Sequence, residues 1–478
     1  MEEKKTAGKA GEMEKYREQI IEAVSTLVAI PSVCEEGGEP PFGKEIDRCL
    51  DAALEMMKKL GFRTFKAEDG KYGYAEIGEG PLFGVLGHLD VVAAKKADGW
   101  EHDPFTPMIK DGYLCGRGTQ DDKGPMVAAA YALVSLLEQG EEGKEKGKEQ
   151  REEGKEKGKE QGEEGKEKGK ELKKRVRFIF GTDEESLWRC MAAYREREEA
   201  PEEGFTPDST FPLTYAEKGL LQVMLYSDEA FPLEITGGDS MNAVAGHASC
   251  PYEEGIEKAL KNLGYGYHRE GDSLVVEGLT AHAKNPWKGI SANLRLLRAL
   301  KEAGYQGEAL DFSLDVLEDK PRFEGFSQED FSDFSGPVTV NFGKMKGGKE
   351  GFTLGLDLRH PVGMEKEKLM KLIREKAEVY HLRLKEFDYL RPIHVPLDSE
   401  MVQKLLTAYR QVTGDEETAP YISAGATYAR AFDHCVAFGA NLPSLPTSEH
   451  QPNERVKIDA LLLASEVYRE AFRLLVMK

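Results

Sequence analysis

Short apolar strand segments alternate with amphipathic helical segments through the first 215 residues of this 478-residue chain. The strand-like runs are Arg63–Ala67, Tyr72–Ile77, Leu82–Leu86 and Arg175–Gly181, and helical periodicity covers 13–30 and 42–61. Apolar strands that alternate with helices are typical of a sheet that is covered on both faces. We therefore predict an α/β domain with a mainly parallel sheet and helices on both faces.

The pattern changes between residues 218 and 390, where half-polar strand runs are interspersed with helical segments. Such a mixture is typical of an α+β unit. After about residue 395, helical periodicity returns on both sides of a segment rich in glycine and alanine. We therefore predict one domain built from residues 1–217 and 391–478, with a second, α+β unit inserted at 218–390.

Residues 140–172 are three copies of an eleven-residue repeat rich in Glu, Lys and Gly. With almost no apolar side chain, the repeat cannot contribute to a hydrophobic core. Its period would suit a long helix, but each glycine costs about 1 kcal/mol at a helical position. We therefore favour a mobile surface insert over a stable helix. Because it precedes a strand, we expect it at the end of the sheet opposite to the carboxyl ends of the strands.

The charge and the cysteine pattern exclude several classes of protein. A net charge of −21 disfavours binding to nucleic acid. No apolar run approaches the ~18 residues of a membrane span, and the N-terminal segment lacks the apolar part of a secretion signal. The six scattered cysteines include no C-x-x-C pair, which argues against a disulfide scaffold and a Cys-built zinc site. We expect a cytoplasmic protein that binds neither nucleic acid nor membranes.

Metal-competent side chains follow predicted strands or lie in glycine- and proline-rich loops. The four segments are Gly87–Asp90, Gly116–Pro125, Gly181–Glu185 and Ser448–Glu454. Each alone could be an ordinary strand end, helix cap or loop. Residues two apart in a strand share a face, so one of His88 and Asp90 could bind a metal while the other orients it. Adjacent residues point opposite ways, so one of Glu184 and Glu185 could bind metal while the other acts as a general base.

One further acid, Asp208, completes a set of ligands that is large enough for two metal ions. Each ion could take one histidine and one terminal carboxylate, with one aspartate shared between the two. Three protein ligands per ion leave a fourth position for water, as in catalytic zinc sites. Imidazole and carboxylate ligands suit zinc, with cobalt or manganese as alternatives.

Eight segments, in order, resemble the dinuclear-zinc amidohydrolases and peptidases that include aminoacylase, carboxypeptidase G and, closest in pattern, the PepV-type dipeptidases. They are GHLDVV, GWEHDPFTP, GRGTQDDKGP, GTDEES, TPDSTFP, GLTAHAKNP, ISAGATYAR and SEHQPNERV. Any one of these segments is a weak signal, but together they span nearly the whole chain. The segment around Gly425 contains fewer glycines than relatives typically have, which leaves the substrate range open.

The resemblance also implies roles for individual residues, most of which lie in these segments. One zinc would be bound by His88, Asp121 and Asp208, and the other by Asp121, Glu185 and His450. Glu184 would be the general base, and Asp90 would orient His88. The inserted unit would act as a lid whose His282 stabilises the oxyanion, with Asn242, Arg359 and Gly425 in contact with the substrate. In relatives, the peptide bond between Asp121 and Asp122 is expected to be cis.

The resulting hypothesis is a dipeptidase that hydrolyses short peptides through a hydroxide bridging two zinc ions, with Glu184 as general base. A deacylase of N-acyl amino acids with the same two metals is an alternative. A third reading is a catalytically inactive binding protein on the same scaffold. In PepV-type relatives the enlarged lid supplies, within one chain, what a dimer partner supplies in other members of the family. The resemblance therefore implies a monomer.

Overall fold

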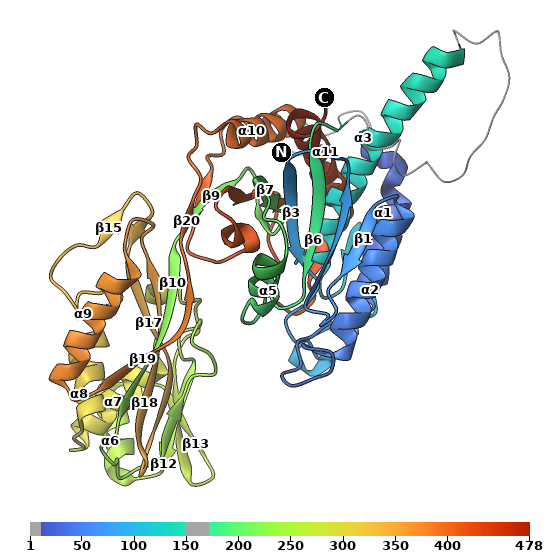
Figure 1. Ribbon diagram of the computed structural model, residues 1–478. Helices are drawn as coiled ribbons and strands as arrows, with labels where there is room; N and C mark the ends of the chain where they lie inside the picture. Colours follow the sequence, from blue (N-terminus) through green and yellow to red (C-terminus); the bar gives the residue numbers. More distant parts are fainter. Residues whose placement is uncertain (1–10, 150–171) are drawn as a thin grey trace. The chain divides into compact units, whose positions relative to one another are not determined.

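The computed structural model describes residues 11–149 and 172–478, which form two units (Figure 1). The first unit holds the residues up to Tyr215, Val395–Tyr421 and Thr427–Lys478, and the second holds Ala216–His394 and Ile422–Ala426. The sequence prediction leaves Ile422–Ala426 in the first domain. This segment joins the second unit because the carbonyl oxygen of Ser423 accepts the Lys218 N–H (2.8 Å), and that of Ala424 accepts a hydrogen bond from Arg359 (3.1 Å).

A mixed sheet forms the centre of the first unit. Four neighbouring strands in its middle are parallel: β6 (Arg175–Gly181), β3 (Leu82–His88), β7 (Glu203–Thr206) and β22 (Cys435–Ala437). The strands on either side are antiparallel: β1 (Arg63–Lys66), β2 (Tyr72–Ile77) and β9 (Thr214–Glu217). This arrangement confirms the predicted α/β fold, with antiparallel margins that the sequence pattern did not indicate.

Helices cover both faces of this sheet, because the apolar side chains of β3 and β6 alternate between the faces. On one face, Leu86 and Ile179 pack in a cluster with side chains of α5 (Arg189–Arg197). On the other, the rings of Phe83 and Phe178 lie 6.5 and 6.3 Å from that of Phe472 in α11. The other helices of the unit are α1 (Arg17–Val28), α2 (Lys44–Lys59), α3 (Lys123–Glu149) and α10 (Glu400–Thr413), and α11 covers Ile458–Leu475.

The second unit is α+β, as predicted, and its sheet is antiparallel throughout. The strand order is β13 (Tyr267–Glu270), β14 (Ser273–Glu277), β12 (His247–Pro251), β11 (Ile235–Gly237), β17 (Thr339–Gly348), β18 (Gly351–His360), β10 (Gly219–Ser227) and β19 (Arg383–Leu390). The helices are α6 (Glu254–Leu263), α7 (Ala292–Glu302), α8 (Glu308–Phe312) and α9 (Lys366–Val379). Alternate residues of β10, such as Leu221 and Val223, enter a core shared with these helices.

The repeat begins as a continuation of helix α3, which extends to Glu149. The predicted mobile insert therefore does not start at residue 140, because a helix that is already formed adds a hydrogen bond with every further residue. Residues 150–171 of the repeat lie outside the described part of the chain. After the repeat, Arg175 pairs with Leu82, at the opposite end of β3 from His88. The segment that follows the repeat therefore lies at the end of the sheet opposite to His88, as predicted.

Two further observations concern the cysteines and the helices. All six cysteines are free thiols, which agrees with the expected lack of a disulfide scaffold. Within 11–149 and 172–478, no helix combines the length and the apolar composition that a bilayer span requires.

Candidate metal centre

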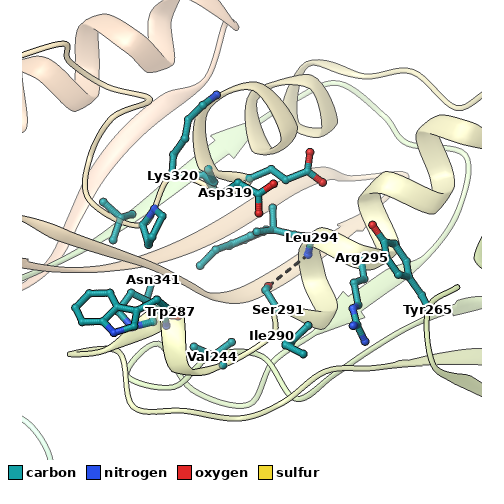
Figure 2. A pocket seen from close by; sticks show the side chains of 17 residues that line it. Val244, Tyr265, Trp287, Ile290, Ser291, Leu294, Arg295, Asp319, Lys320 and Asn341 are labelled. Atoms are coloured by element: carbon teal, nitrogen blue, oxygen red, sulfur yellow. Dashed lines mark hydrogen bonds between the residues drawn. The ribbon is translucent and has the colours of Figure 1, made fainter. Parts of the chain in front are cut away.

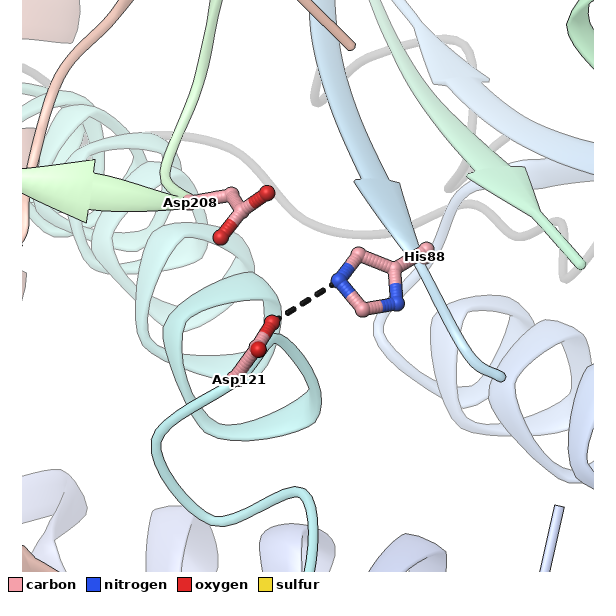
Figure 3. A group of neighbouring side chains, drawn as sticks. All are labelled: His88, Asp121 and Asp208. Carbon is pink, nitrogen blue, oxygen red and sulfur yellow. Dashed lines mark hydrogen bonds and ion pairs between the residues drawn. The ribbon is translucent and has the colours of Figure 1, made fainter. Parts of the chain in front are cut away.

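Three of the predicted ligands meet where the parallel strands end. His88 is the last residue of β3, Asp121 lies just before helix α3, and Asp208 follows β7 (Figure 3). One ligand atom from each of the three lies within 4.8 Å of those of the other two. The Nε2 atom of His88 is 2.9 Å from Oδ1 of Asp121. These segments meet because β3 and β7 are parallel neighbours whose carboxyl ends share one edge of the sheet.

A second group of ligand atoms is built on the same aspartate. The Nε2 atom of His450 lies 2.9 Å from Oδ2 of Asp121 and 3.0 Å from Oε1 of Glu185. Asp121, Glu185 and His450 also have ligand atoms within 4.8 Å of one another. The two oxygens of Asp121 therefore point to different histidines. The structure thus brings together all five predicted ligands, in the two predicted groups.

Asp90 connects the two groups, although not entirely as predicted. Its main-chain carbonyl oxygen lies 2.9 Å from Nδ1 of His88, whereas its carboxylate is 3.6 Å from that atom. The carboxylate instead accepts the backbone N–H groups of Glu184 (3.1 Å) and Glu185 (3.0 Å). One residue therefore contacts the imidazole of His88 and fixes the backbone of the two neighbouring glutamates.

Carboxylates crowd this site, and their pKa values reflect it. Burial, followed by the charges of Asp208, Glu185 and Asp121, raises the pKa of Glu184 well above its ordinary value. Burial and Asp121 likewise raise the pKa values of Asp208 and Glu185. Burial would raise the pKa of Asp121 as well, but hydrogen bonds from His450 and His88 lower it. Such a cluster calls for positive charge, and the two imidazoles and three carboxylates of the two ligand groups suit zinc, cobalt or manganese.

These pKa shifts predict that the metal-free protein loses stability as the pH rises. Ionising Glu184, Glu185 and Asp208 costs free energy in the folded state, and this cost grows above their unfolded pKa values of about 4. Burial lowers the pKa of His450, but Asp121 and Glu185 raise it overall to about 11. Its stabilising effect is therefore complete below an unfolded value of about 6.5 and is lost as the pH approaches 11.

We therefore expect the melting temperature of chelator-treated protein to fall between about pH 6.5 and about pH 10. Zinc should restore it most at the upper end, where the ligands are deprotonated. Because the pKa of Asp121 is lowered, its ionised carboxylate stabilises the folded protein, and this contribution is lost only at acid pH, as the pH falls. Differential scanning calorimetry with and without zinc measures both trends. A melting temperature of the metal-free protein that rises over this range would contradict the expectation.

Two further features shape the loop that carries Asp121: a cis peptide bond and a buried carboxylate. The peptide bond from Asp121 to Asp122 is cis, as the resemblance led us to expect. The buried carboxylate of Glu454 binds this loop, and sequence reasoning assigned it no role although it lies in the segment of His450. The one available signal was an acid four residues after a candidate ligand, in a segment without apolar residues, and such a residue is usually read as exposed.

The remaining predicted site residues belong to the second unit. Asn242 and His282 are exposed and lie on paired segments, because Ala243 bridges to His282 and the carbonyl oxygen of Asn242 accepts the Ala283 N–H (2.8 Å). Arg359 is buried and binds both oxygens of Asp357, at 2.7 and 3.0 Å. The backbone N–H of Gly425 donates to the hydroxyl of Ser423 (2.9 Å). Substrate contact by these residues stays a prediction.

A cavity of about 510 Å³ adjoins the paired segments within the second unit (Figure 2). Its wall includes Trp287, Leu294 and Asn341. The side-chain amide of Asn341 donates to the carbonyl oxygens of Met241 and Ala243, both at 2.8 Å. Asn341 therefore holds the backbone on both sides of Asn242, and the cavity wall supports a predicted substrate-binding loop.

Comparison with known proteins agrees with this geometry. The family model of "Peptidase family M20/M25/M40" matches residues 84–147 and 162–474. A provisionally named dipeptidase of Staphylococcus aureus (strain MW2) is 33% identical over 489 aligned residues, which cover 96% of this chain and 97% of the relative.

Solved structures share the fold at lower identity. Human carnosine dipeptidase 1 aligns with a TM-score of 0.57 and 17% identity, and a di-peptidase from Saccharomyces cerevisiae with 0.57 and 14%. Each alignment covers 97% of both chains. The family match extends over most of the chain and includes all five candidate ligands, so this chain belongs to peptidase family M20/M25/M40 and is a hydrolase of the metallopeptidase type.

Proposed function

We propose that this protein is a dipeptidase that uses two zinc ions, with cobalt or manganese as possible substitutes. His88, Asp121 and Asp208 would hold one ion, and Asp121, Glu185 and His450 the other. The observation that carries the proposal is the double contact of Asp121. Its Oδ1 and Oδ2 each lie 2.9 Å from the Nε2 atom of a different histidine, so one carboxylate belongs to both ligand groups.

Two bound cations would lower the pKa of the attacking water, stabilise negative charge on the scissile carbonyl and offset the like charges around Glu184. Glu184 belongs to neither ligand group, and its backbone is fixed by Asp90. Glu184 would accept a proton from the attacking water and return it to the leaving amine. In this role it acts as general base and then as general acid.

We further propose that the second unit acts as a lid that contributes His282 to the reaction. The Nδ1 atom of His282 accepts the backbone N–H of Lys284 (3.0 Å), so a neutral ring carries its proton on Nε2. That proton can be donated to a carbonyl oxygen that develops negative charge. Asn242, Arg359 and Gly425 would contact the substrate, and the ion pair with Asp357 would hold Arg359 in one orientation.

A substrate panel tests the proposed activity. We expect metal-free protein, loaded in turn with zinc, cobalt or manganese, to hydrolyse unmodified dipeptides faster than N-acetyl and N-succinyl amino acids. A dipeptide would offer a peptide bond to the proposed base Glu184, and its other polar groups to the proposed substrate contacts Asn242, Arg359 and Gly425. Faster cleavage of the N-acyl amino acids would instead identify a deacylase with the same metals. A lack of hydrolysis by protein that retains two ions would favour the inactive binding protein.

We also propose that the protein is a monomer and that it acts in the cytoplasm on small peptides, without nucleic acid or membrane partners. For the monomer, multi-angle light scattering should give a molar mass near the 53.2 kDa of one chain. This mass should not change when the protein concentration is raised tenfold. A mass of two chains at every concentration would contradict the proposal, because the second unit would then not replace a partner.

A further inference from the structure

The carboxylate of Glu454 is buried beneath the loop that carries Asp121. Its side chain has no exposed surface. The Oε1 atom accepts three backbone N–H groups of this loop, from Gly118 (3.0 Å), Gln120 (2.9 Å) and Asp121 (3.3 Å). The Oε2 atom accepts a hydrogen bond from Nη1 of Arg117 (2.6 Å). One carboxylate therefore fixes the backbone up to the aspartate shared by both ligand groups.

The same loop also holds the segment of His450 from its other end. The side-chain oxygen of Gln120 accepts hydrogen bonds from the backbone N–H (2.7 Å) and the hydroxyl (2.8 Å) of Ser448. The side-chain amide of Gln120 donates to Asn441 (2.8 Å). His450 lies between Ser448 and Glu454, so the loop of Asp121 binds the chain on both sides of this histidine.

A third segment, Gly99–Pro107, supports this arrangement. The guanidinium of Arg117 lies 5.4 Å from the ring centre of Trp100, in a cation–π contact. The backbone N–H of Glu101 donates to Asn453 (2.8 Å), whose side-chain amide donates to the carbonyl oxygen of Gly99 (3.3 Å). Both Asn453 and His450 have a φ of 62°, which non-glycine residues rarely adopt without support. The segment therefore helps to hold a loop whose backbone is unusual.

From these contacts we infer that Glu454 and Gln120 are positioning residues that together set the location of Asp121 relative to His450, and with it the affinity for the cations. The inference rests on the proposed function only in that it assumes the two ligand groups bind metal. Glu454 is enclosed by protein and touches no reacting atom, so it acts through Asp121 and His450. Hydrogen-bonded supports of this kind typically change metal affinity about 10–100-fold when they are removed.

Metal titration of Glu454→Gln tests the inference. The amide keeps the shape of the side chain but removes the charge that binds Arg117 and the three N–H groups. We expect the affinity for at least one zinc ion, measured by calorimetry on chelator-treated protein, to fall about 10–100-fold. Dipeptide hydrolysis should then be restored by raising the zinc concentration, and circular dichroism should show that the variant is already folded before zinc is added, which separates lost affinity from lost stability.

A matched control is Glu76→Gln. Glu76 is a partly buried carboxylate of the first unit that, like Glu454, binds an arginine: it accepts hydrogen bonds from Nε (3.0 Å) and Nη2 (2.8 Å) of Arg177, and neither residue belongs to a ligand group. This variant should lower the melting temperature and leave zinc affinity unchanged. Unchanged zinc affinity in Glu454→Gln, or an equal loss in Glu76→Gln, would overturn the inference.

A second variant covers the case in which Glu454→Gln does not fold. Gln120→Ala keeps every contact of Glu454 but removes the hydrogen bonds to Ser448, and should weaken the binding of one ion. Its control is Gln139→Ala on helix α3, where Gln139 bonds Glu12 and Arg469. Two ions bound as tightly by Gln120→Ala as by the wild type would overturn the inference. If the wild type binds two ions without cleaving dipeptides, only the proposed function fails.

Discussion

Glu184→Gln should bind two metal ions and lower kcat by roughly 10²–10⁴-fold, the usual contribution of general acid–base catalysis. Glutamine has nearly the same shape, so the backbone contact with Asp90 is kept (3.1 Å in the wild type). The amide, however, cannot accept the proton of the attacking water. Because Glu184 belongs to neither ligand group, metal content should stay at the wild-type level. Metal analysis together with steady-state kinetics on dipeptides measures both quantities.

Glu198→Gln is a suitable control for this variant. Glu198 is partly exposed, lies in the same unit and accepts a hydrogen bond from the hydroxyl of Tyr72 (2.8 Å), outside both ligand groups. Its kcat should match the wild type. If Glu184→Gln lost an ion, Glu184 would be a ligand and not the base. A kcat close to that of the wild type would require a different proton acceptor.

The strand ends, and with them the neighbourhood of His88 and Glu185, were predictable from the sequence pattern, whereas the full set of five ligands was implied by the family resemblance. A buried parallel strand is apolar along most of its length, so the polar residues that follow Leu82–Leu86 and Arg175–Phe180 mark the strand ends. Ends of neighbouring parallel strands meet at one edge, which is where His88 and Glu185 lie. The pairing of particular oxygens and nitrogens depends on loop geometry and could not be derived from spacing.

Other features were missed because their causes lie in contacts between distant segments. The membership of Ile422–Ala426 in the second unit depends on hydrogen bonds from Lys218 and Arg359, which no local pattern reveals. Asp90 was a candidate because of its carboxylate, but the atom that contacts the imidazole of His88 is its main-chain carbonyl oxygen, which any residue would provide. Glu454 stands in a polar segment, and its burial is explained by the three backbone N–H groups around Oε1 and the guanidinium of Arg117 beside Oε2.

The second large effect is expected for Asp121→Asn. An asparagine side chain offers one carbonyl oxygen, and its NH₂ group donates hydrogen bonds and cannot bind a cation. In the wild type, the two oxygens of Asp121 each lie 2.9 Å from Nε2 of a different histidine, His88 or His450. An asparagine at this position could therefore bind a cation in one ligand group but not in both. We expect at most one ion per chain. We also expect kcat to fall by roughly 10³-fold or more, because several kcal/mol of charge stabilisation are lost.

Metal content per chain, measured beside activity, separates this expectation from a simple loss of folding. Asp69→Asn provides the control, because Asp69 forms surface ion pairs with Arg197 (2.9 Å) and Lys71 (3.2 Å), away from both ligand groups. It should retain two ions and full activity. If Asp121→Asn also retained two tightly bound ions, the shared carboxylate would not be what joins them. The pairing of His88 with His450 through one aspartate would then need another bridge, and the described residues offer no second carboxylate that belongs to both groups.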